Sequence, residues 1–291
     1  MKNEIYKNKE WLKNKYVKEQ YGSSHIARYC NVDDGTIIYY LKKYNIPIRS
    51  RSESCKITKA KKYKLNEDYF EFIDDAHKAY WLGFLMADGT MREHKVGCLQ
   101  LSFELCEDDV YILDQFNHDI NSTYRVQINT CKNSSKNRAR LVITNYNFCK
   151  HLIKHGIIPN KTGKEKIPNS IPDNYIKDFI RGFFDGDGCI MFSNNDRARG
   201  KFHIVSCSYN ILCNLLKIIP ADFSNKSLHL KAGSDYIYEL ETANLVNLAK
   251  IYDYLYYENC LCLKRKENKF KEFLIYFKQS KRLTKRYSPI H

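Results

Sequence analysis

Trp81-Leu82-Gly83-Phe84-Leu85-Met86-Ala87-Asp88-Gly89 and Ile180-Arg181-Gly182-Phe183-Phe184-Asp185-Gly186-Asp187-Gly188 are two copies of one pattern. In each, a glycine is followed by two apolar residues, a variable residue and a small residue, and Asp-Gly ends the stretch. The two final acids, Asp88 and Asp187, lie 99 residues apart, which indicates a long duplication rather than a solenoid repeat. The sequence therefore predicts two equivalent halves, each built around one such stretch.

The charge of the chain is concentrated at its ends. The 291 residues carry a formal net charge of +15. Residues 1–65 hold sixteen lysines and arginines against six acids, and residues 264–291 hold ten against two, so the middle is slightly acidic. Basic ends around a near-neutral body favour a polyanionic partner, nucleic acid before an anionic membrane. A merely solvated basic surface is the alternative.

Hydropathy and cysteine spacing indicate in which cellular compartment the protein is expected. No apolar run approaches the roughly 20 residues that span a bilayer, and no apolar stretch near the start resembles a secretory signal. The eleven cysteines form no C-x-x-C pair and are odd in number, so we expect reduced thiols rather than a disulfide framework or a zinc site. The expected location is intracellular, in a bacterial or phage cytoplasm or an organelle, with no membrane partner.

Residues 1–50 are predicted to form a small helical module of the helix-turn-helix type. A first helix spans residues 10–20, and two short helices follow, separated by a turn at Asn31-Val32. In such a unit the start of the last helix faces base edges and its end faces phosphates. The expected base-edge residues are Asp34, Gly35, Thr36 and Tyr39 or Tyr40, and the expected phosphate contacts are Lys42, Lys43 and Arg49. A plain protein-binding bundle is the alternative.

Residues 51–66 read as a basic linker, and two repeats follow, at residues 67–170 and 171–291, the second with a basic C-terminal tail. Each repeat shows the order helix, two strands, helix, two strands, helix. The first motif helix is predicted at about Ala76–Asp88, ended by Gly89 in the left-handed conformation. Among the predicted strands are those at about Arg138–Thr144 and Lys201–Ser206. The predicted fold class is therefore α+β: two pseudo-symmetric αββαββα repeats with curved antiparallel sheets, plus the small all-α module.

The two Asp-Gly stretches are predicted to be helices that pack against each other. Gly83 and Ala87, and in the second copy Gly182 and Gly186, lie four residues apart and leave one helix face nearly bare. An acid at the C-terminal end of a helix faces the negative end of the helix dipole. If the bare faces pack together, Asp88 and Asp187 meet there and need a cation, for which oxygen ligands favour Mg²⁺.

With these features, both stretches resemble the motif of the LAGLIDADG homing endonucleases, over roughly residues 70–280 and in the single-chain, two-repeat form. The resemblance implies that the two motif helices form the interface between the repeats. It implies Mg²⁺, with Mn²⁺ as a substitute, held by Asp88 and Asp187 with Gly89 and Gly188 beside them. It also implies double-strand cleavage that leaves short 3′ overhangs, and sheets that read the major groove of a long site.

The resemblance implies further site residues by position. A basic residue near the end of each repeat corresponds to Lys161 in the first and to Lys264, or Lys266, in the second. A polar residue after the second strand positions water, and Glu107 and Ser208 occupy about that place. Two departures stand out: the earlier motif acid is Met86 in the first copy and Asp185 in the second, and Arg181 replaces a small residue and is expected to face away from the helix pair.

Polar side chains on the predicted strands and hairpins suit contacts with bases and phosphates. The candidates for DNA binding there are Arg92, Gln127, Arg138, Arg140, Arg197, Arg199, Lys201 and Lys231. The predicted function is a site-specific, Mg²⁺-dependent DNA endonuclease that acts on double-stranded DNA as a monomer. The alternative is a non-cleaving protein on the same scaffold, either an intron RNA maturase or a transcription regulator.

Overall fold

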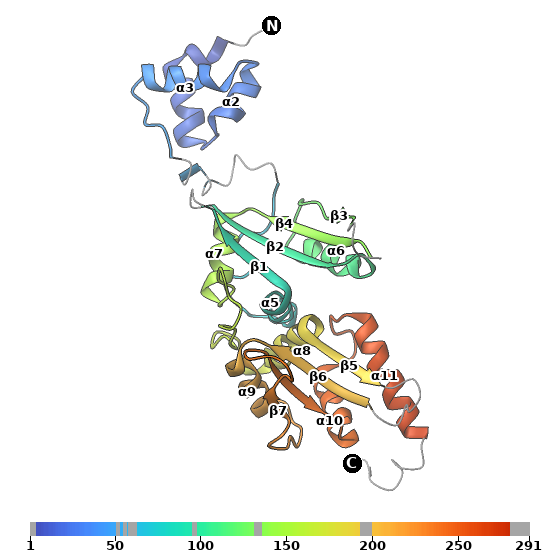
Figure 1. Ribbon diagram of the computed structural model, residues 1–291. Helices are drawn as coiled ribbons and strands as arrows, with labels where there is room; N and C mark the ends of the chain where they lie inside the picture. The colour runs from blue at the N-terminus through green and yellow to red at the C-terminus, as the bar shows by residue number, and fades with distance from the viewer. Residues whose placement is uncertain are drawn as a thin grey trace.

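The computed structural model describes residues 4–50, 53–54, 57, 63–94, 98–130, 136–192 and 200–279. The chain forms a small helical module and two α+β repeats, with the module at the end of the molecule next to the first repeat (Figure 1). The module has its own hydrophobic core, separate from the single core shared by the two repeats. Among the described residues, no helix combines the length and apolar character needed to cross a bilayer.

The N-terminal module, residues 4–50, has two short helices joined by a turn in the region where a helix-turn-helix unit was predicted. Its elements are η1 (Glu4–Lys7), α1 (Lys9–Lys13), the π-helical turn η2 (Asn14–Lys18), α2 (Ser23–Cys30) and α3 (Asp34–Lys43). The turn between α2 and α3 begins at Asn31, which adopts the left-handed conformation (φ 53°). Asp33 caps α3 by accepting a hydrogen bond from the Gly35 N–H at 2.8 Å.

The first repeat follows the predicted order of elements. It consists of α5 (Ala76–Asp88), β1 (Gly89–Glu93), β2 (Leu99–Cys106), η3 (Glu107–Asp109), α6 (Val110–Asp119), β3 (Gln127–Asn129), β4 (Arg138–Ile143) and α7 (Tyr146–Lys154). α5 begins where Asp75 caps it by accepting from the Lys78 N–H. It does not end in the expected left-handed glycine: Gly89 is extended (φ −71°, ψ 137°) because it is already the first residue of β1.

The second repeat has the same order. Its elements are η4 (Asp173–Tyr175), α8 (Ile176–Asp187), β5 (Gly188–Phe192), β6 (Gly200–Ser206), α9 (Tyr209–Ile218), β7 (Leu228–Leu230), β8 (Tyr238–Thr242), α10 (Leu245–Leu255) and α11 (Lys264–Gln279). Both sheets are antiparallel and four-stranded, in the order β1-β2-β4-β3 and β5-β6-β8-β7. The predicted α+β fold of two equivalent repeats is confirmed.

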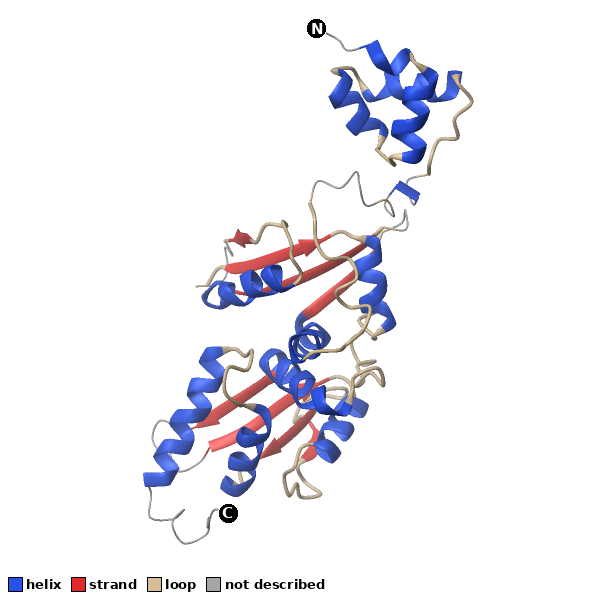
Figure 2. Cartoon of the chain, turned by 180° about the vertical axis from the view of Figure 1, so that it is seen from behind, coloured by secondary structure: helices blue, strands red, loops and turns tan. Residues whose placement is uncertain are grey.

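Each sheet has a covered and an open face. Figure 2 shows helices lying over one face of the sheet in the second repeat. Along β2 and β6, residues on the helix side, such as Phe103 and Ile204, are fully buried, while most of their neighbours on the other side are polar, with Val205 an exception. The open faces therefore present polar side chains on the surface of each repeat.

The centre of the molecule is the contact between α5 and α8. Residues 79–86 of α5 and 178–185 of α8 are all buried, so each helix is enclosed on every side. Because each motif helix runs directly into the first strand of its own sheet, this contact also sets where the two sheets lie relative to each other.

The cysteines agree only in part with the expected reduced state. Eight of the described cysteines are free thiols, and Cys30, Cys149, Cys260 and Cys262 among them are buried. Cys98, in contrast, is disulfide-bonded, which departs from the expectation for that residue.

Candidate active site

Asp88 and Asp187 come together at the ends of α5 and α8. A Cβ atom built on Gly186 would lie 2.2 Å from the Cβ of Ala87 and 3.2 Å from Oδ2 of Asp88. The Asp88 carboxylate thus lies against the opposite helix, one residue before Asp187. Gly186 provides the space that this carboxylate needs, as the bare-face pattern predicted.

The surroundings of the acid pair, Asp88 and Asp187, favour their protonated forms. Burial raises the pKa of Asp88, against the opposing charges of Lys266 and Lys161. Burial and then the charge of Asp88 raise the pKa of Asp187 to about 7. Two acids of the same charge at two helix C-termini are therefore held close at an electrostatic cost that a cation would relieve.

Two lysines approach the acid pair from equivalent places. Nζ of Lys161 donates to the carbonyl oxygen of Ala87 at 2.9 Å. Nζ of Lys266 lies 3.1 Å from the carbonyl oxygen of Gly186, and also bonds to the carbonyls of Phe184, Asp185 and Gly188 at 2.5–2.9 Å. Ala87 and Gly186 occupy the same position in the two motifs, so each lysine satisfies terminal carbonyls of one motif helix.

Burial alters both amines. It lowers the pKa of Lys161 despite the nearby charges of Glu165, Asp187 and Asp88. It lowers the pKa of Lys266 to about 8, despite the charge of Asp185. The acid pair therefore lies between two largely desolvated amines.

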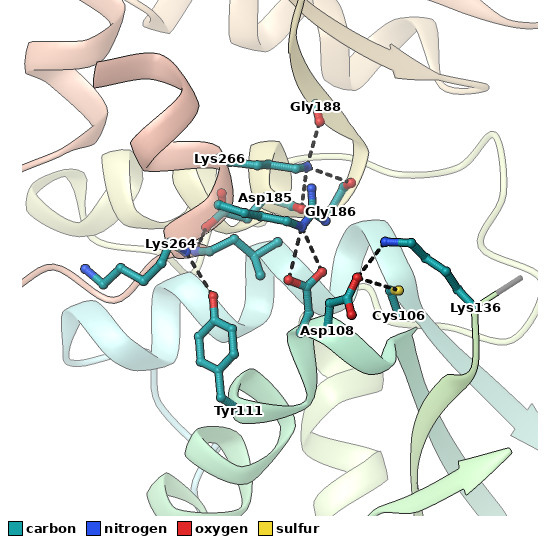
Figure 3. Close-up of polar contacts among 12 residues, drawn as sticks. Cys106, Asp108, Tyr111, Lys136, Asp185, Gly186, Gly188, Lys264 and Lys266 are labelled. Atoms are coloured by element: carbon teal, nitrogen blue, oxygen red, sulfur yellow. Dashed lines mark hydrogen bonds and ion pairs between the residues drawn. The ribbon is translucent and has the colours of Figure 1, made fainter. Parts of the chain in front are cut away.

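The sequence-based choice of Lys264 over Lys266 does not agree with this geometry. The Lys264 side chain is 61% exposed and pairs with Glu267 at 3.1 Å. The backbone N–H of Lys264 donates a hydrogen bond to the Tyr111 hydroxyl. Figure 3 shows Lys266 reaching Gly186 and Gly188, whereas the side chain of Lys264 points away from them. The structure thus places Lys266, the alternative, opposite Lys161.

Asp185, the motif acid that is Met86 in the first copy, lies in the helix interface and not at the acid pair. Its Oδ2 accepts hydrogen bonds from the Tyr80 hydroxyl at 2.9 Å and the Leu263 N–H at 2.7 Å. Burial raises its pKa to about 6. Tyr80 belongs to α5, so the Asp185 carboxylate joins the two repeats.

Glu107 and Ser208, the candidates for positioning water, occupy equivalent places. The last glycine of the first motif, Gly89, pairs with Phe103, four residues before Glu107. In the second repeat Gly188 pairs with Ile204, four residues before Ser208. Ser208 is buried, caps α9 and donates to the carbonyl of Glu165 at 2.6 Å. Glu107 accepts from Nδ2 of Asn137 at 2.8 Å. Both side chains therefore have structural partners.

Glu165 was not predicted from the sequence as a residue of this site. It is buried, its charge acts on both Lys161 and Asp187, and its Oε2 atom has no hydrogen-bond partner among the residues that the structure describes. Its place four residues after Lys161 was the available signal, but many surface acids have such a spacing. The residue four positions after Lys266 is Phe270, so this acid belongs to one half only.

The donor set at the acid pair fits a hard divalent cation. Two carboxylates converge where Gly186 leaves room, and oxygen ligands suit Mg²⁺. Of the two glycines expected beside them, Gly188 already uses its carbonyl to accept from Lys266 at 2.6 Å. Gly89, in β1, is buried next to Asp88.

A second group with metal-ligand chemistry lies on the open face of the second sheet. His203, Glu239 and Glu241 bring their ligand atoms within 4.8 Å of one another. Lys201 already pairs with Glu241, and Lys231 lies 3.7 Å from Glu239. Since these amines neutralise the carboxylates, the group is better explained as a network of ion pairs than as a cation site.

The predicted DNA-binding residues of the sheets lie mostly on the open faces. Arg140 pairs across the first sheet with Gln127 and, on its other side, with Glu104, whose carboxylate lies 3.7 Å from Nε of Arg140 and 3.6 Å from that of Arg138. Arg92 extends the same face on β1, and Lys201 and Lys231 belong to the second repeat. Arg197 and Arg199 lie outside the described residues.

The N-terminal module presents a different set of residues from the one expected. Thr36 is half-buried, and Lys42 and Lys43 are exposed at the end of α3. Tyr40 packs against Tyr6 and Tyr44, so the neighbouring Tyr39, which is 59% exposed, is the accessible ring.

Arg49, expected near phosphates, is used inside the module. Its guanidinium stacks 3.8 Å above the Tyr16 ring and donates to the carbonyls of Tyr16 and Tyr21. The arginine thus fastens the end of the module to its own core, which a sequence pattern could not show.

Comparison with known proteins adds a likeness of fold. No family model and no curated protein matches the sequence. Among solved structures, the chain is similar to the LAGLIDADG meganuclease I-AabMI bound to uncleaved DNA, with 14% identity, a TM-score of 0.48, and coverage of 69% of this chain and 91% of that one. It is also similar to the meganuclease I-CpaMI bound to uncleaved DNA (14%, 0.48, 71% and 94%) and to the I-LtrWI LAGLIDADG homing endonuclease bound to target DNA (12%, 0.47, 76% and 92%).

These structural neighbours are LAGLIDADG homing endonucleases. Theirs is the family that the two motifs resemble. At such low identities and TM-scores, the likeness assigns no activity and no residue's role to this chain.

Proposed function

We propose that this chain is a site-specific, metal-dependent DNA endonuclease of the homing type. The observation that carries the proposal is the meeting of Asp88 and Asp187 at the ends of two abutting helices, each end also contacted by a lysine amine. Two largely desolvated acids that form no ion pair with the residues the structure describes destabilise a fold, and such arrangements are typical of functional sites.

The acid pair would hold the divalent cation, Mg²⁺ with Mn²⁺ as a substitute. When bound, such a cation neutralises the charge of the two acids and of a phosphodiester and supplies Lewis-acid chemistry for its hydrolysis. Asp88 and Asp187 would contribute the oxygen ligands, and the packing of α5 on α8 brings the two side chains together. Lys161 and Lys266 keep positive charge next to the acids, where negative charge develops on a phosphate under attack.

The near two-fold arrangement suits a substrate with two antiparallel strands. Each repeat supplies one acid and one lysine, so each strand of a duplex would meet one set, with cuts staggered to leave short 3′ overhangs. Because one chain contains both repeats, we propose that it acts as a monomer.

The open faces of the sheets and the N-terminal module would bind the duplex. Arg92, Arg138 and Arg140 suit guanine edges or phosphates, and Gln127 suits adenine. The exposed Lys42 and Lys43 add contacts that depend on salt but not on sequence.

The test begins with a duplex selected from a randomised library by binding to the full chain, then placed in a plasmid. With Mg²⁺ the protein should linearise the plasmid, and a chelator should abolish cutting. Asp88→Asn and Asp187→Asn should each bind the duplex but no longer linearise it. Asp173→Asn makes the same change at an exposed acid and should cut normally.

Linearisation at the wild-type rate by either active-site variant would show that the acid pair is not the active site. Selective binding without cutting under any divalent cation would favour the non-cleaving alternative.

A further inference from the structure

The start of the first repeat is fastened to one place on the first sheet. The Tyr63 ring lies 4.7 Å from that of Tyr124. The backbone of Lys64 exchanges hydrogen bonds with Thr123: its N–H donates to Oγ1 at 2.8 Å, and its carbonyl accepts from the Thr123 N–H at 2.9 Å. Asn66 N–H donates to the carbonyl of Ile120 at 2.8 Å. We call residues 63–66 with their partners the anchor.

The anchor lies toward the end of the sheet that is remote from the acid pair. The Tyr124 hydroxyl donates to the carbonyl of Thr144, and Thr144 accepts from the side chain of Gln100. β1 begins beside Asp88, where Gly89 pairs with Phe103, and runs outward through the pairing of Arg92 with Gln100. The anchor therefore fixes Tyr63, the point at which the chain from the N-terminal module joins the body, at the outer end of the first repeat.

The length of chain before the anchor limits where the N-terminal module can bind. Arg49 fastens the end of the module to its core, and 12 residues lie between Ser50 and Tyr63, which makes 13 steps from Cα to Cα. A chain of that length spans at most about 45 Å when fully extended. An eight-residue strand such as β2 is about 26 Å long. Reaching DNA beyond the second sheet would require passing both sheets, roughly 50 Å, before any flank begins.

The surface between the anchor and the open face is suited to a departing duplex. A hollow of about 600 Å³ lies there, lined by Tyr63, Tyr124, Arg125, Gln127, Val142 and Thr144 among others. Arg125 is exposed, and Gln127 belongs to the open face described above. Exposed cationic and amide groups thus continue from the sheet to the anchor, the contacts that a phosphate backbone takes.

We propose that the N-terminal module binds duplex DNA immediately beyond the half-site contacted by the first repeat, and on that side only. The inference rests on the proposed function, because it presumes that the two sheets lie along one duplex. It adds that the DNA site is asymmetric: the protein contacts flanking DNA at only one of the two ends of the site. A reach of about 45 Å corresponds to roughly 13 base pairs at 3.4 Å per step.

The experiment is a hydroxyl-radical footprint of the full chain on the library-selected duplex, with Ca²⁺ in place of Mg²⁺. Protection should extend past one half-site by up to about 13 base pairs plus the width of the module. The double variant Lys42→Glu/Lys43→Glu should lose that extension alone. The control Lys150→Glu/Lys154→Glu reverses two exposed lysines on α7, which covers the opposite face of the first sheet, and should keep it. Arg138→Ala/Arg140→Ala should weaken protection in the half-site next to the extension, which identifies it as the first repeat's.

A second measurement uses wild-type protein and shortened DNA. Removing the flank on the extended side should weaken binding about tenfold and lower the salt dependence by about two counterions, one per lysine. Removing the opposite flank should change neither. Protection beyond the second half-site, beyond both or beyond neither would overturn the inference. If the footprint overturns the inference but the selected duplex is still bound and cut, the proposed function stands. If no duplex is enriched at all, both the inference and the proposed function fail.

Discussion

Gly83 and Gly182 face each other's helices so closely that neither position has room for a side chain. A Cβ on Gly83 would lie 2.0 Å from the carbonyl oxygen of Phe179, and a Cβ on Gly182 would lie 2.0 Å from that of Tyr80. The two clashes are the same contact repeated by the pseudo-symmetry. Because the obstacle is backbone on both sides, the helices would have to move apart, and the acid pair at their ends would separate with them.

Gly83→Ala and Gly182→Ala should each destabilise the protein by about 3 kcal/mol or more, since an added methyl group cannot be relieved by a side-chain rotation. Denaturant unfolding followed by circular dichroism measures the change. Gly233→Ala places the same methyl group where nothing lies within 4 Å, so it should cost only the left-handed backbone, about 1 kcal/mol. Equal losses at all three positions would contradict the packing explanation.

Lys266→Met should remove cutting of one strand, and Lys264→Met should not. Lys266 bonds to the end of α8 beside the acid pair, whereas Lys264 is exposed and paired with Glu267. On a plasmid that carries the selected duplex, we expect Lys266→Met to accumulate nicked circles and Lys264→Met to linearise normally. Circular dichroism of both variants separates loss of activity from loss of folding. If only the Lys264→Met variant accumulated nicked circles, Lys264 and not Lys266 would be the lysine that acts in the second repeat.

The motif helices could be predicted from the sequence because their signals are local. The bounds predicted for the first, Ala76–Asp88, are those observed, since the Asp75 cap and the Asp-Gly end both lie next to the helix. β1 was not located, because it starts at the very residue that was expected to terminate the helix, Gly89. Period-two patterns elsewhere placed β4 and β6 to within a residue or so.

The side chains around the acid pair could be predicted only in part. The convergence of Asp88 and Asp187 follows from the bare helix faces, which a sequence shows. The choice between Lys264 and Lys266 depends on the rotation of α11 against β5, a tertiary contact that no local pattern encodes. For the same reason the sequence could not show that Arg49, expected near phosphates, and Ser208, expected to position water, donate to backbone carbonyls distant in the sequence.

Arg181→Met should destabilise the second repeat strongly. Arg181 is fully buried, donates to the carbonyls of Leu255 and Leu261, and pairs with the equally buried Asp178 at 2.6 Å. Its guanidinium also lies 5.5 Å from the centre of the Tyr80 ring, which belongs to α5, so the side chain does not simply face away from that helix as expected. Removing it leaves an uncompensated buried carboxylate, at a cost of about 3–5 kcal/mol. The double variant Asp178→Asn/Arg181→Met should recover part of that loss in thermal unfolding. A double variant as unstable as the sum of the two single ones would contradict a direct charge pairing.

The contact between His77 and Asp119 should make stability depend on pH in a defined window. Nδ1 of His77 lies 2.9 Å from Oδ2 of Asp119, which also accepts from the Trp81 indole. Burial opposes ionisation of Asp119, but hydrogen bonds from His77, Trp81 and Gln115 lower its pKa to about 2. The hydrogen bond to Asp119 in turn raises the pKa of His77.

The two shifts act at opposite ends of the pH range. The lowered pKa of Asp119 stabilises the fold above its unfolded value, about 3.9, and this contribution is lost as the pH falls toward 2. The raised pKa of His77 stabilises the fold fully below about pH 6.5, and that contribution is lost as the pH rises through the raised value. Both contributions are therefore complete between about pH 4 and 6.5.

His77→Gln keeps a hydrogen-bond donor but removes the positive charge. Because His77 is 48% exposed, solvent screening limits the expected loss to about 1 kcal/mol or less at pH 5. The difference from wild type should shrink steadily above neutral pH, where His77 itself loses its proton. His118→Gln, at a neighbouring histidine that is 84% exposed, should leave the curve of unfolding free energy against pH unchanged. A wild-type-minus-variant difference that grew with rising pH would show that the pairing has the wrong sign.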